Sequence, residues 1–258
     1  MPEHAMPDVS PPLIEMRAIS KAFGAIQALD GVDLSIAPGE VLGLVGDNSA
    51  GKSTLMKVLT GAYRPDDGEI RVGGRRVELT SPHDSRRLGI EMVYQDFALC
   101  GNLDVATNVY LGRWPVRRGL VQTRRMEAET GSILEDLGVD AGIVRQKVET
   151  LSGGRQQMVA IARAVSFDPK LVILDEPTAN LSVVATEHVL ALVRELRSRG
   201  VAQIIISHRL QDIFAVGDRV MVLKRGRNVG ERRVADTTEG EVLALIVHGD
   251  AAEVARRE

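Results

Sequence analysis

Three short apolar runs predict strands of a parallel β-sheet. They are VLGLV at residues 41–45, LVILD at 171–175 and QIIIS at 203–207. Near-continuous apolar runs of this length are typical of strands that are covered on both faces. Such strands occur in sheets flanked by helices, so these runs favour an α/β fold.

Helical patterns separate these strands. Residues 52–60 form one predicted helix and residues 185–199 another, which ends before Gly200. The apolar stripe of the second helix consists of Val189, Leu192, Val193 and Leu196. Strands that alternate with helices predict a doubly wound α/β core.

A third predicted helix lies in LSGGRQQMVAIARAV, residues 151–165. Its apolar residues recur at the spacing i, i+3, i+4, i+7 and would face inward: Met158, Ile161, Ala162 and Val165. This leaves the start of the helix free for another role, and that start consists of Ser152, Gly153 and Gly154.

Shorter runs near the N-terminus predict a second, antiparallel sheet. LIEMRAIS at 13–20 and VDLSI at 32–36 read as strands, and EIRVGGRRVEL at 69–79 reads as a hairpin that turns at two glycines. Residues 219–233 predict a further hairpin, and the segment from Asp236 predicts a terminal helix.

Strand patterns vanish between about residues 99 and 165, where we expect an inserted helical lobe. A chain of 258 residues, 44% of them hydrophobic, is long enough to bury one sizeable core. The expected organisation is a flexible tail at residues 1–12, one domain at 13–249 and a second tail at 250–258.

Composition narrows the classes of partner. A net charge of -3 with 26% charged residues indicates no general affinity for nucleic acid, so we expect no nucleic-acid partner. The single cysteine, Cys100, favours a reducing cytosol and is interpreted as a small apolar filler. No signal peptide and no run of membrane-spanning length is found. The basic stretch RWPVRR at 113–118 is interpreted as a solvated loop, with a partner contact as the alternative.

The sharpest chemical signal is GDNSAGKST, which matches the phosphate-loop pattern G-x-x-x-x-G-K-[ST] between a strand and a helix. A glycine-rich turn aims backbone N–H groups at a phosphate, and the helix start adds its positive dipole end. Lys52 would reach the β and γ phosphates of ATP, and the Ser53 hydroxyl would hold Mg²⁺. The predicted nucleotide-binding residues of this loop are Gly46, Asp47, Asn48, Ser49, Ala50, Gly51, Lys52, Ser53 and Thr54.

The apolar strand that begins at Leu171 ends in two adjacent carboxylates. Asp175 is the candidate for the magnesium shell, and Glu176 would orient or deprotonate the attacking water. Paired acids after a strand are by themselves more often a capped strand end. The phosphate loop in the same chain favours the catalytic interpretation.

Two further polar residues end other predicted strands. Gln95 follows GIEMVY and His208 follows QIIIS. Ligand contacts in α/β sheets gather at the carboxyl ends of the strands, where both would lie. A lone glutamine or histidine is usually structural, but these two accompany a phosphate loop.

Together these motifs resemble the nucleotide-binding subunit of an ABC transporter, from about Leu13 to Gly249. GDNSAGKST resembles its Walker A motif, LVILDE its Walker B motif with the catalytic glutamate, and LSGGRQQ its signature. The resemblance implies a P-loop NTPase fold that binds ATP and Mg²⁺. It also implies that Gln95 contacts the metal in the catalytic site, that His208 is the catalytic switch histidine, and that Phe23 stacks on adenine. A core phenylalanine is the alternative for Phe23.

In this family two subunits pair head to tail. The resemblance implies that Ser152, Gly153 and Gly154 cap the ATP held by the phosphate loop of a partner. The partner would be a second copy of this chain or another ATPase subunit. ATP hydrolysis would then loosen the pair.

Longer phrases, such as YQDFALCGNLDVATNVYLGR, are similar to ATPase subunits of bacterial importers of ribose, xylose or fructose. This implies a transmembrane permease, a periplasmic solute-binding protein and a location on the cytoplasmic face of the inner membrane. The alternatives are an ABC ATPase for another cargo or for export, and one acting on nucleic acid or ribosomes.

Two positions depart from the family pattern. Ser49 stands where the phosphate loop usually has glycine, and its side chain disfavours a positive φ. Ser182 stands near the place of an aspartate that many members carry at the dimer contact.

Overall fold

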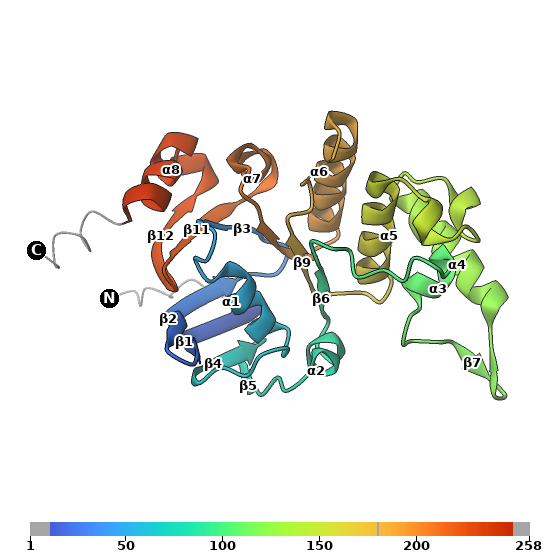
Figure 1. Cartoon of the computed structure of the whole chain (residues 1–258), viewed down its shortest axis with the longest axis horizontal. Coiled ribbons are helices and arrows are strands. Elements are labelled where there is room, and N and C mark those ends of the chain that lie inside the picture. The colour runs from blue at the N-terminus through green and yellow to red at the C-terminus, as the bar shows by residue number, and fades with distance from the viewer. Residues whose placement is uncertain (1–10, 180, 250–258) are drawn as a thin grey trace, which may run out of the picture.

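A computed structural model describes residues 11–179 and 181–249. Its centre is a six-stranded sheet in which five strands are parallel and the edge strand β12 is antiparallel. The strand order is β12 (Arg227–Arg233), β11 (Arg219–Lys224), β3 (Val41–Gly46), β10 (Ala202–Ile206), β9 (Leu171–Asp175) and β6 (Ile90–Val93) (Figure 1). The three predicted central strands and the hairpin at 219–233 are confirmed.

Both faces of this sheet are buried, as the continuous apolar runs predict. On β3, Leu42 and Leu44 face one apolar cluster while Val41 and Val45 face the other. Successive side chains of a strand point to opposite faces, so a strand buried on both sides needs apolar residues at every position.

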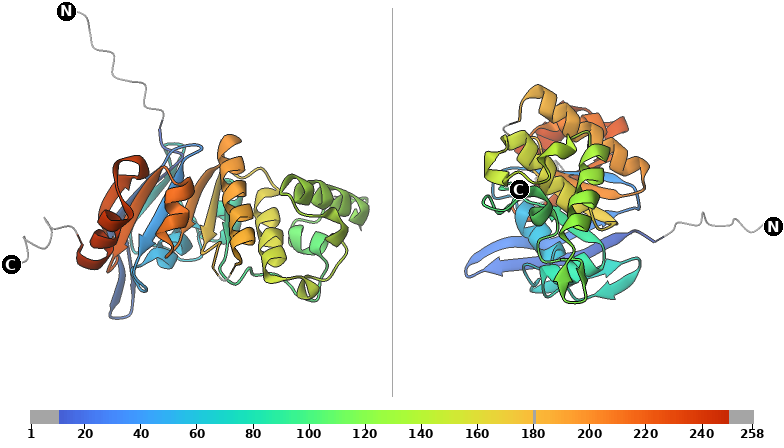
Figure 2. Two further views of the ribbon diagram at one scale, coloured as in Figure 1. Left: turned by 90° about the horizontal axis from the view of Figure 1, so that it is seen from above. Right: turned by 90° about the vertical axis from the view of Figure 1, so that its right-hand side faces the viewer.

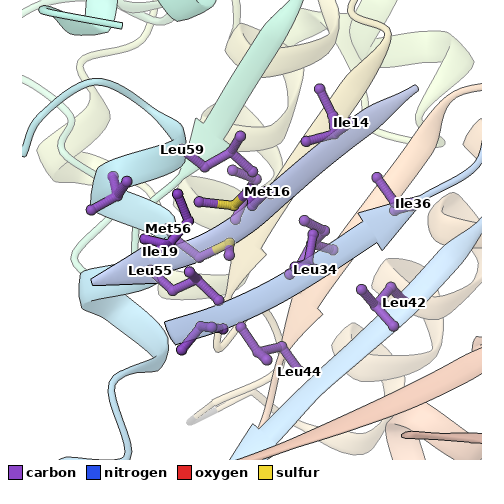
Figure 3. Packing of buried hydrophobic residues seen from close by; sticks show 14 of the residues in the cluster. Ile14, Met16, Ile19, Leu34, Ile36, Leu42, Leu44, Leu55, Met56 and Leu59 are labelled. Carbon is purple, nitrogen blue, oxygen red and sulfur yellow. The ribbon is translucent and has the colours of Figure 1, made fainter. Parts of the chain in front are cut away.

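The first face is covered by helix α1 (Lys52–Leu59) and a four-stranded antiparallel sheet. This sheet has the order β2 (Ile26–Ile36), β1 (Ile14–Phe23), β4 (Asp67–Val72) and β5 (Arg75–Val77). Figure 3 shows Leu55, Met56 and Leu59 of α1 packed between side chains of this sheet and of β3. The antiparallel sheet and its hairpin at Gly73 and Gly74 are confirmed, and both glycines have positive φ.

Helices cover the second face (Figures 1 and 2). They are α5 (Gly153–Val165), α6 (Val183–Ser198), α7 (Leu210–Val216) and α8 (Glu239–His248). The predicted helices at 151–165 and 185–199 and the terminal helix are confirmed. A hydroxyl side chain caps the start of each of α5, α6 and α8 by accepting a hydrogen bond from a backbone N–H of the first turn. The capping residues are Ser152, Ser182 and Thr238 respectively.

The helical lobe extends beyond the end of the sheet (Figure 2). It holds α3 (Val105–Val109), α4 (Thr123–Asp136) and two short 3-10 turns (Ala141–Ile143 and Val148–Thr150). These elements and α5 enclose a third apolar cluster. A short helix, α2 (Pro82–Arg87), precedes β6, and one 3-10 turn (Val234–Asp236) follows β12.

The lobe also contains two short strands that the sequence analysis did not predict. Strands β7 (Val116–Arg117) and β8 (Leu120–Val121) form a small hairpin at the outer end of the lobe. Two-residue strands carry no readable periodicity, which is why the sequence did not reveal them. The predicted tails at 1–12 and 250–258 lie almost wholly outside the described residues.

Candidate functional site

One cavity of about 370 Å³ lies at the carboxyl ends of β3, β9 and β6. It gathers residues that are far apart in the chain, as the strand-end argument predicts. Ten predicted site residues line it: Asn48, Ser49, Ala50, Gly51, Lys52, Ser53, Thr54, Gln95, Asp175 and Glu176. The other predicted residues, Phe23, Gly46, Asp47, Ser152, Gly153, Gly154 and His208, do not line it.

The phosphate loop begins and ends on glycines with backbone angles that other residues rarely adopt. Gly46 has φ 148° and Gly51 has φ 105°. A Cβ atom on Gly46 would lie 2.1 Å from the backbone oxygen of Leu223, so no side chain fits there. The loop closes through a hydrogen bond from the Ala50 N–H to the Asp47 carbonyl at 3.1 Å.

Lys52 folds back over this loop. Its Nζ donates to the carbonyl oxygens of Gly46 at 2.7 Å and Asp47 at 2.9 Å. Gly46 and Asp47 therefore position the ammonium group without lining the cavity themselves. Burial lowers the pKa of Lys52, although Glu176, Asp175 and Asp47 act in the opposite direction.

Burial shifts the pKa of Asp175 in the opposite direction, because here the charged form is the deprotonated one. Burial raises the pKa of its carboxyl, and the neighbouring Glu176 carboxylate raises it further, while Lys52 opposes both. The charged forms of a buried cation and a buried anion are thus both disfavoured in one cavity. A ligand that brings its own anionic and cationic groups would pair with both charges and offset the cost of burying them.

Glu176 and His208 meet at the ends of adjacent strands. The His208 Nδ1 lies 2.8 Å from the Glu176 Oε2. Strands β9 and β10 are paired in register up to Asp175 and Ile206, and the Glu176 N–H donates to the Ile206 carbonyl at 2.9 Å. Glu176 has a φ of 51°, an unusual value for a non-glycine residue that often accompanies functional sites.

A buried contact that the sequence did not reveal joins the loop after Glu176 to helix α7, which begins two residues after His208. The Thr178 hydroxyl donates to an Asp212 carboxylate oxygen at 2.5 Å, and both residues are at most 5% exposed. Arg209, next to His208, lies 3.4 Å from the same carboxylate oxygen. The two residues are 34 positions apart in the chain, so no local sequence pattern indicates that they are in contact.

A second unpredicted contact holds the phosphate loop from behind. The Gly226 N–H, at the β11–β12 turn, donates to the Ala50 carbonyl at 2.9 Å, and the Gly226 carbonyl accepts from the Asp30 N–H at 2.8 Å. The segment from Ile26 to Ala28 lines the cavity beside the loop. These backbone contacts leave no signal in the side-chain pattern.

Ser49 adopts the left-handed conformation that its side chain disfavours, with φ 72°. The expectation that the serine side chain keeps this position from a positive φ is therefore wrong. The chain accepts the local strain of this conformation, about 1–2 kcal/mol.

Phe23 lies outside the cavity lining. Its ring packs edge-on against Tyr63 with centroids 5.2 Å apart, and Lys21 Nζ lies 5.7 Å from its centroid. The ring is 43% exposed, so it is not a core residue. The adenine-stacking role of Phe23 stays a prediction.

The start of α5 faces solvent. Ser152 and Gly153 are exposed, and a Cβ on Gly153 would meet no atom within 4 Å. The Ser152 Oγ accepts from the Arg155 N–H at 3.5 Å, which leaves it available as a donor. Ser182, at the departure near the dimer contact, caps α6 by accepting from the Ala185 N–H at 3.3 Å.

Residues 11–179 and 181–249 hold no group of three or more histidine, cysteine, aspartate or glutamate side chains that could bind a metal ion. In these same ranges, no helix combines the length and apolar character that crossing a bilayer requires.

A family model described as ABC transporter matches residues 29–179, more than half of the chain. The chain belongs to the ABC transporter family. The matched range of this ABC family chain includes the phosphate loop, Gln95, the start of α5 and the pair of acids, whereas His208 lies beyond it.

Two curated relatives are similar over nearly all of this ABC family chain. A ribose import ATP-binding protein of Rubrobacter xylanophilus is 47% identical over 236 residues, which cover 92% of this chain and 47% of the relative. A xylose/arabinose import ATP-binding protein of Sulfolobus acidocaldarius is 42% identical over 234 residues, which cover 91% and 93%. The chain thus spans about half the length of the ribose relative and nearly all of the other.

A solved structure has the same fold. It is a dimeric, post-hydrolysis state of an ATP-binding cassette bound to ADP and Pi, with a TM-score of 0.75 and 25% identity over 86% of this chain and 98% of that one. The expected P-loop ATPase fold is confirmed.

Proposed function

We propose that this chain is the ATP-hydrolysing subunit of an ABC importer and works as a head-to-tail pair that drives monosaccharide uptake through a separate permease. The observation that carries this proposal is the single cavity that brings the phosphate loop, Gln95, Asp175 and Glu176 together, with His208 on Glu176.

The residues around the cavity fit ATP and Mg²⁺. Lys52 and the backbone of the phosphate loop suit an anionic chain of phosphates. Ser53, Gln95 and Asp175 supply a hydroxyl, an amide and a carboxylate oxygen in one cavity. Mg²⁺ prefers oxygen ligands and takes few of them from the protein when it also binds phosphates, so this set is sufficient.

The remaining residues have distinct tasks. Mg²⁺, when bound, neutralises part of the charge on the β and γ phosphates. Glu176 accepts a proton from the attacking water or orients it. His208 holds the Glu176 carboxylate in place, and the Thr178–Asp212 hydrogen bond holds the loop after Glu176 against α7.

The second phosphate-binding element comes from the partner. Ser152 and the first N–H groups of α5 do not line the chain's own cavity, and they present a hydroxyl and a helix dipole to solvent. An ATP held by one protomer is therefore capped by the other. The dimeric cassette to which this chain is similar supports such a pair.

The names of two relatives support the proposed cargo. Two relatives named for import of ribose and of xylose or arabinose support a monosaccharide as the transported solute. The permease and a periplasmic sugar-binding protein complete the system. The chain is held peripherally at the cytoplasmic face of the cell membrane.

A cross-linking experiment tests the head-to-tail pair. In a Cys100→Ser, Glu176→Gln background, one protomer carries Asn48→Cys and the other Ser152→Cys. We expect a disulfide between protomers when the two are mixed with ATP and oxidised, and none without ATP. A protomer with Arg194→Cys, on the exposed face of α6, is the matched control. Absence of the ATP-dependent cross-link would contradict the pairing.

Uptake of radiolabelled ribose and xylose tests the cargo. Cells that lack the chain should recover uptake with the wild-type chain but not with Glu176→Gln. Uptake of a labelled amino acid serves as the control, and recovery of that uptake instead would replace the sugar by another solute.

A further inference from the structure

The β7–β8 hairpin carries the densest group of exposed apolar side chains in the described part of the chain. The described part of the chain has eleven exposed large apolar residues, and five of them lie between residues 111 and 121, in and next to the hairpin. They are Leu111 (37% exposed), Trp114 (40%), Val116 (59%), Leu120 (74%) and Val121 (48%). Concentrated exposed apolar surface of this kind marks a site of interaction.

The same segment is strongly basic. Residues 105–126 contain five arginines and no acidic residue, in a chain whose net charge is -3. Two of the five are committed to ion pairs, Arg113 with Glu91 and Arg125 with Glu129. Arg117, Arg118 and Arg124 are exposed, and no carboxylate within residues 11–179 or 181–249 pairs with them.

The hairpin is shaped by its turn and anchored at its base. Arg118 and Gly119 have φ of 52° and 79°, the combination of a type I′ turn that fits the twist of two paired strands. The Gln122 N–H donates to the Pro115 carbonyl at 2.8 Å and closes the base. Arg113 fixes that base to the body of the protein, because its guanidinium pairs with Glu91 and lies 4.3 Å from the centroid of the Phe167 ring.

This hairpin therefore holds the apolar side chains of its two strands away from the core. Val116 lies opposite Val121, and Leu120 lies opposite Arg117, so both faces of the ribbon combine apolar surface with nearby arginines. Figure 1 shows the hairpin at the outer end of the helical lobe, and none of its residues lines the cavity described above. Neither the phosphate chemistry nor the core explains why these side chains are exposed.

We propose that the β7–β8 hairpin binds the surface of a bilayer that contains anionic phospholipids. Valine and leucine would enter the boundary between headgroups and acyl chains, and Trp114 would lie at headgroup level, where tryptophan is favoured. Arg117, Arg118 and Arg124 would contact lipid phosphates, with their aliphatic stems beside the apolar side chains of the hairpin.

The expected binding is weak and sensitive to salt. A few apolar side chains and three arginines give one marginal, reversible membrane contact, and stable anchoring needs a second one. The hairpin thus orients the subunit on the membrane and does not replace its attachment to a permease. This inference concerns lipid and holds whatever solute the system moves.

The chain provides its own probe, because Trp114 is its single tryptophan. The full-length protein is titrated with vesicles of equimolar phosphatidylglycerol and phosphatidylcholine, and separately with pure phosphatidylcholine. We expect a blue shift of the Trp114 emission with the anionic vesicles alone and quenching by acyl chains brominated near the headgroup. About 0.5 M NaCl, which shortens the Debye length to roughly 4 Å, should reverse the binding.

Charge variants separate the hairpin from general electrostatics. Arg117→Glu with Arg118→Glu should weaken binding to the anionic vesicles by about 30-fold or more. Arg75→Glu with Arg194→Glu makes the same change in net charge at two exposed arginines elsewhere and should leave binding within about twofold. Equal loss in both variants would overturn the proposal.

Apolar variants and a folding control complete the test. Val116→Ser with Leu120→Ser should abolish the blue shift, whereas Leu243→Ser with Val247→Ser, an exposed apolar pair on α8, should not. ATP hydrolysis in solution reports folding of every variant. If Trp114 of the wild-type protein is not quenched by brominated lipid, the proposal fails. It also fails if the hairpin variants lose co-purification with a membrane protein while vesicle binding is unchanged, since that result assigns the hairpin to a protein partner.

Discussion

The imidazole Nδ1 of His208 lies 2.8 Å from the Oε2 of Glu176, although 32 residues separate them in the chain. Two parallel strands, β9 and β10, end side by side and bring the two side chains together. Glu176 is 14% exposed at its side chain and His208 is 67% exposed. The carboxylate is therefore the sheltered member of the pair, and the histidine reaches it from the open side.

We predict that Glu176→Gln lowers ATP hydrolysis by about 10²- to 10⁴-fold, because an amide cannot accept the proton of the attacking water. ATP affinity should stay within a few-fold of wild type, since Lys52 and the phosphate loop are untouched. Steady-state turnover and equilibrium ATP binding check both parts. Glu135→Gln makes the same change at an exposed glutamate of α4 and should behave as wild type. Turnover at the wild-type rate would exclude Glu176 as the base.

The sequence predicted the convergence of Lys52, Asp175 and Glu176 because each lies at or after the end of an apolar run that is typical of a buried parallel strand. Parallel strands end at one edge of the sheet, so the positions of these side chains follow from the pattern. The order of the motifs likewise predicted the family, and the loss of strand patterns after about residue 99 predicted the inserted helical lobe.

Contacts through the backbone could not be predicted in this way. The hydrogen bonds of Gly226 with Ala50 and Asp30 involve no side chain, and the Thr178–Asp212 bond depends on how α7 packs. The β7–β8 hairpin has too few residues per strand for a period to appear. Glu176 with φ 51° shows the same limit, because a tertiary environment imposes that conformation.

Replacing the strained serine in the phosphate loop should stabilise the protein. Ser49 has φ 72°, which costs a non-glycine residue about 1–2 kcal/mol. Ser49→Gly removes this strain but gains backbone freedom in the unfolded chain, so the net increase in the free energy of unfolding is about 0.5–1 kcal/mol. Urea denaturation measures it. Ser49→Ala keeps the strain and serves as control; an equal gain in both variants would locate the effect elsewhere.

Gly226 should matter to ATP binding although it lies outside the cavity lining. A Cβ at this position would lie 2.7 Å from the Ala28 oxygen, on a backbone with φ 76°. Gly226→Ala should therefore destabilise the protein by about 2–4 kcal/mol and weaken ATP binding through the displaced Ala50.

Gly24→Ala is the matched control for Gly226→Ala. Its φ is 59°, but an added Cβ would meet nothing within 4 Å, so it reports the conformational strain alone, about 1 kcal/mol. Thermal unfolding and ATP titration distinguish the two variants. Equal losses of stability and unchanged ATP affinity would show that the Gly226 contact does not support the loop.

Asp175 should destabilise the nucleotide-free protein at neutral pH. Burial raises the pKa of its carboxyl above the ordinary value of 3.8, so the folded state disfavours the charged form. The destabilisation is complete above the folded-state pKa and disappears once the pH falls below 3.8, where the carboxyl is neutral in both states.

Asp175→Asn removes the charge at every pH. Without nucleotide it should raise the free energy of unfolding at pH 7 by about 1 kcal/mol, and the gain should shrink as the pH falls toward 4. Asp168→Asn, at an exposed aspartate before β9, should give no such gain. With ATP and Mg²⁺ the sign should reverse, because the ligand stabilises the wild type through the carboxylate that the variant lacks. Denaturant titrations at several pH values, with and without ATP and Mg²⁺, measure both effects. A gain that does not change with pH would assign the stabilisation to packing and not to charge.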